Sequence, residues 1–304
     1  MKALSASVVA AIDDLEFAAR LVVEGLRAGG HRSPFHGYSA EFQQHRPYRA
    51  GDDLKYLDWK LLARTDRLYS RQFRETTSMS VMIALDSSAS MQYPAGDIPK
   101  FRYASILAAA LAYLISNQGD AVGLMSMTNG ALTYVPARGG RVHLRSLLAR
   151  LDGLTPGGTW EAPRVIARSA DLLKRRGVVV VISDFYDDEE NTQRELRRVR
   201  RRGHDVAMLQ VMSAAEVAFP FSGDIEFEAL EGGAKQLVDA RTAAKGYQAN
   251  IRDFLKRTQL SAQRDGIEYA LGTTDAPPER VLREYLLRRD AMHGAVHRGG
   301  PDVA

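Results

Sequence analysis

The sequence has 304 residues, 45% hydrophobic and 26% charged, which excludes disordered and collagen-like chains and fits one large globular domain with additions or two modest domains. It contains no cysteine, which excludes disulfide frameworks, thiolate zinc sites, iron–sulfur clusters and cysteine nucleophiles. Its 41 basic and 37 acidic residues leave a net charge of only +4, a small excess for a dedicated nucleic-acid binder.

Two features of the sequence bear on where the protein resides. Asp13, Asp14 and Glu16 stand where a secretory signal needs its apolar core, so we expect no signal peptide and a cytoplasmic protein. The most apolar of the long uncharged stretches has only ten consecutive apolar residues, 106–115, where a membrane-spanning helix needs about 20. We therefore expect a buried helix there and no transmembrane segment, while peripheral contact with a membrane stays open.

The first predicted elements are an N-terminal helix and a small accessory module. Apolar residues recur at helical spacing over 5–28 and two adjacent glycines follow, so residues 1–30 are predicted to form an N-terminal helix. Residues 31–78 are rich in arginine, aspartate and aromatic residues, with turn signals and a strand-like run over 68–73. This segment is predicted to form a β-rich accessory module.

Beyond residue 78, short apolar runs alternate with helical segments, which is typical of a mostly parallel sheet covered by helices on both faces. The predicted strands are 81–86, 120–127, 131–135, 178–183, 205–212 and 267–271, and the predicted helices lie near 100–117, 142–151, 160–175, 189–202, 242–264 and 278–289. The fold class is therefore α/β, with a doubly wound, Rossmann-like sheet over 79–291. A hairpin is expected as an insertion at 224–238, and residues 292–304 are expected to form a flexible tail.

Side chains that carry oxygen atoms occur in three loops of the predicted sheet domain, two of them directly after a strand and one before a helix. The first sheet strand is followed by Asp86, Ser88 and Ser90, whose alternation lets a turning loop aim three oxygens at one point. Thr159 precedes a predicted helix, and Asp184 follows a buried strand. Open α/β sheets bind ligands outside the carboxyl ends of their strands. Hard oxygen donors with few carboxylates suit Mg²⁺, with Mn²⁺ as the alternative ion, better than Ca²⁺.

These five residues, Asp86, Ser88, Ser90, Thr159 and Asp184, resemble the metal-ion-dependent adhesion site of von Willebrand factor A domains. The resemblance implies that fold, a cation held by the hydroxyl groups, and two aspartates that act largely through water. It also implies that a protein target supplies an acidic side chain to complete the octahedron. This chain departs from many members of that family because Phe185, and not glycine, follows Asp184.

A narrower resemblance covers most of the chain. It is carried by runs on both sides of the metal motif, among them Gly30-His31-Arg32-Ser33, Arg46-Pro47-Tyr48, Gly51-Asp52-Asp53, Leu57-Asp58-Trp59, Val238-Asp239 and Tyr269-Ala270-Leu271. These runs resemble the bacterial domain-of-unknown-function family 58. That resemblance implies a partner, an AAA+ ATPase of the MoxR type, beside which the protein acts as an adaptor or assembly chaperone. The partner would hydrolyse ATP, because this chain shows no P-loop.

Other interpretations of the same residues remain open. Asp86, Ser88 and Ser90 could be a helix N-cap cluster without any ion. An enzyme, a metal-dependent hydrolase or phosphatase, could use the same Mg²⁺, but the sequence has no G-x-S-x-G or G-x-G-x-x-G motif and no histidine expected at the sheet edge. The basic run Arg194–Arg202 could bind nucleic acid, although a solvated helix end explains it as well. We expect a non-enzymatic, Mg²⁺-dependent protein-binding module and no nucleic acid.

Overall fold

The computed structural model describes residues 4–28, 40–49, 57–75, 79–94, 97–186, 189–228, 230 and 235–294. The chain divides into two compact units. One unit is Phe35–Met79, and the other joins Met1–Pro34 to Ser80–Ala304. The larger unit is therefore discontinuous in the sequence.

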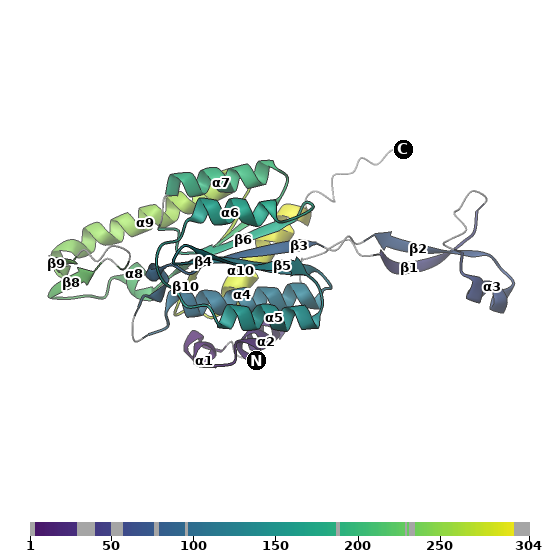
Figure 1. Cartoon of the computed structure of the whole chain (residues 1–304), viewed down its shortest axis with the longest axis horizontal. Helices are drawn as coiled ribbons and strands as arrows, with labels where there is room; N and C mark the ends of the chain where they lie inside the picture. Colours follow the sequence, from purple (N-terminus) through teal and green to yellow (C-terminus); the bar gives the residue numbers. More distant parts are fainter. Residues whose placement is uncertain are drawn as a thin grey trace. The chain divides into compact units, whose positions relative to one another are not determined.

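The larger unit is built on a six-stranded sheet in the order β10-β7-β6-β3-β4-β5 (Figure 1). The strands are β3 (Ser80–Asp86), β4 (Ala121–Thr128), β5 (Ala131–Arg138), β6 (Val178–Ser183), β7 (Asp205–Met212) and β10 (Glu268–Thr273). All neighbours pair in parallel except β4 and β5. Every residue of β6 is buried, as expected of a strand covered on both faces.

The edge strand β5 extends beyond its predicted end. The predicted strand ends at Val135, the residue before Pro136, which has no amide proton for a sheet ladder. In the structure β5 runs on to Arg138, and its pairing with β4 shifts register between Val122 and Leu124. Proline is compatible with an edge strand beside a bulge, because no further strand needs its missing amide proton.

Helices cover both faces of the sheet, so the predicted doubly wound α/β fold is confirmed (Figure 1). One face carries α4 (Lys100–Asn117), α5 (Arg141–Asp152) and α10 (Pro278–Gly294), and the other carries α6 (Ala162–Asp171), α7 (Glu189–Arg201) and α9 (Ala240–Arg264). The apolar run 106–115 lies within α4 and is almost wholly buried. Among the described helices, none is long and apolar enough to cross a membrane.

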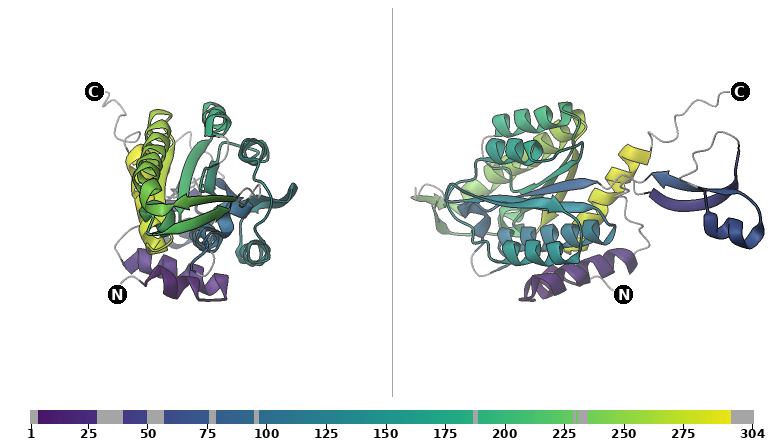
Figure 2. Two further views of the ribbon diagram at one scale, coloured as in Figure 1. Left: turned by 90° about the vertical axis from the view of Figure 1, so that its left-hand side faces the viewer. Right: turned by 45° about the vertical axis from the view of Figure 1, so that its right-hand side comes forward.

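The N-terminal segment forms two helices, α1 (Ala6–Ala10) and α2 (Leu15–Ala28), where one helix over 5–28 was expected. Asp14 begins the second helix, since its Oδ1 accepts a hydrogen bond from the Phe17 amide at 3.0 Å. The apolar face of α2 packs on α4 and α10, and Figure 2 shows both purple helices outside the α4 layer. Although the prediction set residues 1–30 apart, these helices belong to the same compact unit as the sheet.

Two further small sheets complete the described structure. Strands β8 (Asp224–Glu228) and β9 (Lys235–Asp239) pair antiparallel after the short helix α8 (Ala214–Ala218). In the smaller unit, β1 (Ala40–Pro47) pairs antiparallel with β2 (Tyr69–Glu75), and α3 (Trp59–Thr65) lies between them in sequence. The expected tail, 292–304, overlaps the end of α10, and residues 295–304 lie outside the described part of the chain.

Candidate functional site

The candidate site lies where the strand order of the large sheet reverses. From β3 the chain adds β4 and β5 on one side, then returns to add β6, β7 and β10 on the other. Strands β3 and β6 are therefore parallel neighbours, and both end at the same edge. Asp86 ends β3 and Asp184 follows β6. Ligands of open α/β sheets bind at such a reversal.

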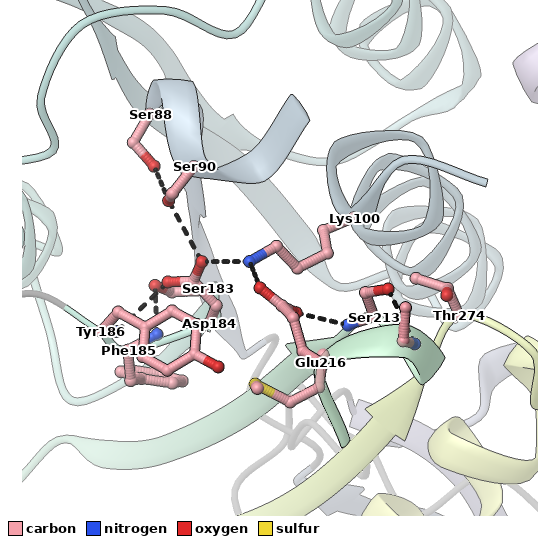
Figure 3. A network of polar contacts seen from close by, with 12 residues as sticks. Ser88, Ser90, Lys100, Ser183, Asp184, Phe185, Tyr186, Ser213, Glu216 and Thr274 are labelled. Atoms are coloured by element: carbon pink, nitrogen blue, oxygen red, sulfur yellow. Dashed lines mark hydrogen bonds and ion pairs between the residues drawn. The ribbon is translucent and has the colours of Figure 1, made fainter. Parts of the chain in front are cut away.

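The serine loop after β3 joins the two strand ends. The Ser87 side chain anchors the loop to β4, with its hydroxyl 2.7 Å from the carbonyl oxygen of Met127. Ser88 and Ser90 hydroxyl oxygens lie 2.9 Å apart. The Ser90 hydroxyl donates a hydrogen bond of 3.1 Å to Oδ2 of Asp184, as Figure 3 shows. Two serines and one carboxylate thus form a continuous chain of oxygen atoms.

Asp86, the last residue of β3, is hydrogen-bonded to the serine loop and is only 1% exposed. One carboxylate oxygen accepts a hydrogen bond from the Ser88 amide at 2.8 Å, and the other accepts one from the Ser183 hydroxyl at 2.6 Å. Burial, together with the negative charge of Asp184, raises the pKa of Asp86 to about 7. Asp86 therefore both shapes the serine loop and places titratable charge beneath it.

Thr159 is on a loop bonded to the serine loop. The Ala89 amide donates a hydrogen bond of 2.9 Å to the carbonyl oxygen of Gly158, the residue before Thr159. Gly158 has a φ of +67°, and a Cβ atom there would come within 2.6 Å of the Asn129 side chain. Only glycine fits this close approach. Thr159 itself is exposed, whereas Asp86, Ser88 and Asp184 are buried, so the site opens toward solvent on the side of Thr159 and the partly buried Ser90.

A lysine absent from the predicted set lies inside this site. Lys100, the first residue of α4, is 1% exposed, and its Nζ lies 2.7 Å from Oδ2 of Asp184 and 2.7 Å from Oε1 of Glu216. Figure 3 shows the ammonium group between the two carboxylates. Burial by itself would lower the pKa of Lys100, but the two carboxylates outweigh it and raise the pKa above its ordinary value.

Glu216 connects this lysine to the short helix α8. Its second carboxylate oxygen accepts a hydrogen bond of 2.7 Å from the Ser213 amide, which completes a capping box at the start of α8. Burial raises the pKa of Glu216, an effect that the charge of Lys100 partly offsets. One signal in the sequence pointed to Lys100: a cation at a helix N-terminus opposes the helix dipole and needs acidic partners. Glu216 gave no comparable signal.

The backbone conformation of Phe185 shows how this chain accommodates a residue other than glycine after Asp184. Phe185 has a φ of +58°, the left-handed conformation that glycine adopts without strain. Its side chain is buried among the residues of the core. The turn after β6 thus keeps a glycine-like backbone while an aromatic ring fills the interior.

The other candidate groups lie away from the site. Arginines of the basic run 194–202 form ion pairs with acidic neighbours, among them Arg194 with Glu190 at 3.0 Å and Arg202 with Asp171 at 2.7 Å. This agrees with a solvated helix face. Of the histidines whose side chains are described, His143 bonds to the Val122 carbonyl oxygen and His204 precedes β7, so both lie away from the serine loop. In the described residues no three His, Asp or Glu side chains are grouped to hold a metal ion.

The fold agrees with the class of protein that the sequence resembles. A doubly wound sheet with one antiparallel edge strand, and Asp-x-Ser-x-Ser at the end of its first strand, is the arrangement implied by the resemblance to von Willebrand factor A domains. Among solved structures, the conserved hypothetical protein BatB from Bacteroides thetaiotaomicron is 16% identical, with a TM-score of 0.49 over 70% of this chain and 100% of that one. An aerotolerance-related membrane protein from Bacteroides fragilis is 18% identical, with a TM-score of 0.47 over 68% and 98%.

Sequence comparison gives the family. Residues 44–257 match the family described as protein of unknown function DUF58. The uncharacterized proteins Rv1480 of Mycobacterium tuberculosis and Mb1516 of Mycobacterium bovis are each 31% identical over 228 residues, which are 74% of this chain and 71% of each relative. The chain belongs to the DUF58 family, and the resemblance seen in its sequence is confirmed.

Proposed function

We propose that this protein is a non-enzymatic protein-binding module whose site at the carboxyl edge of the sheet takes Mg²⁺, or Mn²⁺, and through it an acidic side chain of a protein target. The observation that carries the proposal is the chain of oxygens from Ser88 through Ser90 to Asp184, at the reversal of strand order. Hydroxyl and carboxylate oxygens are the donors that Mg²⁺ prefers.

The charge of the site supports a cation. Within the buried network, Lys100 supplies one positive charge, while Asp184 and Glu216 supply two negative charges, and Asp86 adds a third above its pKa of about 7. This buried excess of negative charge favours a further cation. Ser88, Ser90 and Thr159 would hold the ion, with Asp86 and Asp184 behind them. When bound, the ion would offer a coordination position to a partner carboxylate.

The second part of the proposal is the partner. We infer that the protein acts in the cytoplasm as an adaptor or assembly chaperone with a MoxR-type AAA+ ATPase, which is what the resemblance to its family implies. The target would supply the acidic side chain and the ATPase the energy of ATP hydrolysis. A hydrolase reaction at this site would need a general base. The described histidine side chains at 143 and 204 lie elsewhere, and the Asp86 carboxylate is 1% exposed and held by the Ser88 amide and the Ser183 hydroxyl, which favours binding over catalysis.

Titration calorimetry with Mg²⁺ and Mn²⁺ tests the cation site. Wild type is expected to bind one ion per chain, and Ser88→Ala to weaken binding at least tenfold by removing a hydroxyl ligand. Ser222→Ala, at an exposed loop serine far along the chain, is the matched control and is expected to bind as wild type does. Equal affinity in Ser88→Ala and wild type would contradict the assignment.

The partner is tested separately, with the purified MoxR-type ATPase of the same organism immobilised without nucleotide. Wild-type protein and Ser222→Ala are expected to be retained on the immobilised ATPase. In a separate assay, ATP hydrolysis is expected from the ATPase and not from the purified protein alone. ATP hydrolysis by the pure protein, or no retention at any protein concentration, would refute this part of the proposal.

A further inference from the structure

We propose that Lys100 is the built-in cation of this site and sets its affinity for divalent ions, because its ammonium group competes with them for Asp184. The inference rests on the proposed cation site and adds its control. A divalent ion would bind strongly only when Asp184 is released from Lys100, which then keeps Glu216 as its partner.

The burial of Lys100 is the first step of the argument. Lysine is almost never fully buried unless its charge is paired, because leaving water is costly for an ammonium group. Here the side chain is 1% exposed, and each of two carboxylates contributes an oxygen at 2.7 Å. The Tyr186 ring adds a third favourable contact, with its centroid 5.1 Å from Nζ. The ammonium is therefore a fixed part of the interior.

The position of the ammonium is the second step. Oδ2 of Asp184 accepts a hydrogen bond from the Lys100 ammonium group, at 2.7 Å, and another from the Ser90 hydroxyl, at 3.1 Å. The same carboxylate oxygen thus binds both the built-in cation and the chain of serine hydroxyls. A divalent ion held by Ser88 and Ser90 would be a near neighbour of the ammonium, and like charges repel strongly in a buried site.

The second carboxylate, that of Glu216, keeps Lys100 in an ion pair when Asp184 is released. Glu216 holds Nζ through Oε1 while its Oε2 accepts the Ser213 amide, so the glutamate is fixed from both sides. Lys100 can lose its contact with Asp184 and stay paired with Glu216. The free-energy cost of replacing the ammonium group by a divalent ion at Asp184 is therefore low. The exchange also links the site to α8, because the glutamate that retains the ammonium is the one that caps this helix.

Removing only the charge tests the proposal. Lys100→Met keeps an unbranched apolar stem and leaves Asp184 and Glu216 without their cation. Its affinity for Mn²⁺, measured by titration calorimetry, is expected to be at least tenfold tighter than that of wild type. Its melting temperature is expected to rise on adding Mn²⁺ by more than that of wild type, since a ligand stabilises the state it binds. Lys245→Met removes an exposed lysine of α9 and is the matched control, expected to behave as wild type.

A second variant shifts the affinity the other way and covers the case in which Lys100→Met does not fold. Glu216→Gln still offers an oxygen to the Ser213 amide but leaves the ammonium paired with Asp184 alone. Its Mn²⁺ affinity is expected to fall at least threefold below wild type. An unchanged affinity would overturn the proposal.

The outcomes separate this inference from the proposed function. If wild type binds Mn²⁺ and folded Lys100→Met binds it no more tightly, Lys100 is not the competing cation, although the site itself stands. If only Lys100→Met binds, Lys100 does control the site, and the cation-dependent function fails for wild type. If neither binds, both proposals are wrong.

Discussion

At the scale of single residues, the charge of Asp86 depends on the fold. Its carboxylate is buried beneath the serine loop and faces the negative charge of Asp184, and both effects hold its pKa near 7, far above the ordinary value of 3.8. Between about pH 4 and pH 7 the folded protein therefore keeps a proton that the unfolded chain has lost. The free energy of unfolding must fall as the pH rises through this window.

The variant Asp86→Asn isolates this effect, because an amide oxygen can still accept the Ser88 amide hydrogen bond. In EDTA, wild type is expected to lose about 1 to 3 kcal/mol of stability relative to Asp86→Asn between pH 5 and pH 7, following roughly 1.4 kcal/mol per pKa unit. Urea unfolding at several pH values measures the difference. Parallel pH profiles for the two proteins would show that Asp86 is ionised in the folded state throughout.

At the scale of elements, the contact between β4 and its edge partner β5 depends on a glycine. A Cβ atom at Gly123 would come within 2.7 Å of the Ala137 nitrogen and of the Val135 carbonyl oxygen, both backbone atoms that cannot move alone. The register between the two strands shifts at the same point. The absence of a side chain at Gly123 therefore lets β5 pair with β4 on both sides of the register shift.

We expect Gly123→Ala to destabilise the protein by about 1 to 3 kcal/mol, the range for overpacked interiors. Gly246→Ala is a matched control, because it lies in an exposed part of α9 with no atom within 4 Å of the added Cβ. Alanine there should stabilise the helix by about 0.5 to 1 kcal/mol. Urea unfolding of both variants checks the pair, and two changes of the same sign would be inconsistent with this account.

At the scale of the whole molecule, the large unit is interrupted by the small one. Helices α1 and α2 precede residues 35–79 in the sequence, yet α2 packs on α4 and α10 with Leu15, Val22 and Leu26 buried. Arg102 of α4 also donates hydrogen bonds to the carbonyl oxygens of Ala10 and Ile12. Helices α1 and α2 therefore complete the core of the sheet domain.

Two deletions should then have opposite results. Replacing residues 35–79 with a flexible Gly/Ser linker is expected to leave the melting temperature and the Mn²⁺ affinity of the sheet domain close to those of the full chain. Removing residues 1–28 is expected to lower the melting temperature by at least 10 °C, because the apolar faces of α4 and α10 become exposed. Calorimetry of the purified variants decides, and equal losses in both would mean that the two units fold as one.

The sequence by itself determined most of the architecture, because local periodicity states which residues face an apolar interior. It placed β6 at 178–183 and α4 at 100–117, as the structure has them, and it identified the oxygen side chains that follow the strands. The sequence also indicated the family, because the short segments that resemble family 58 can be recognised without the structure. Boundaries shifted where local rules were overridden, as at Pro136 in the edge strand.

Only the tertiary structure decided what the site contains. Lys100 and Asp184 are 84 residues apart, and Lys100 and Glu216 are 116 apart, so no local pattern pairs them. Their meeting depends on the strand order, which brings β3, β6 and β7 side by side and sets α4 and α8 at the edge where β3 and β6 end. Periodicity fixes which face of an element is buried, but the neighbours that a buried charge meets follow from how the elements assemble.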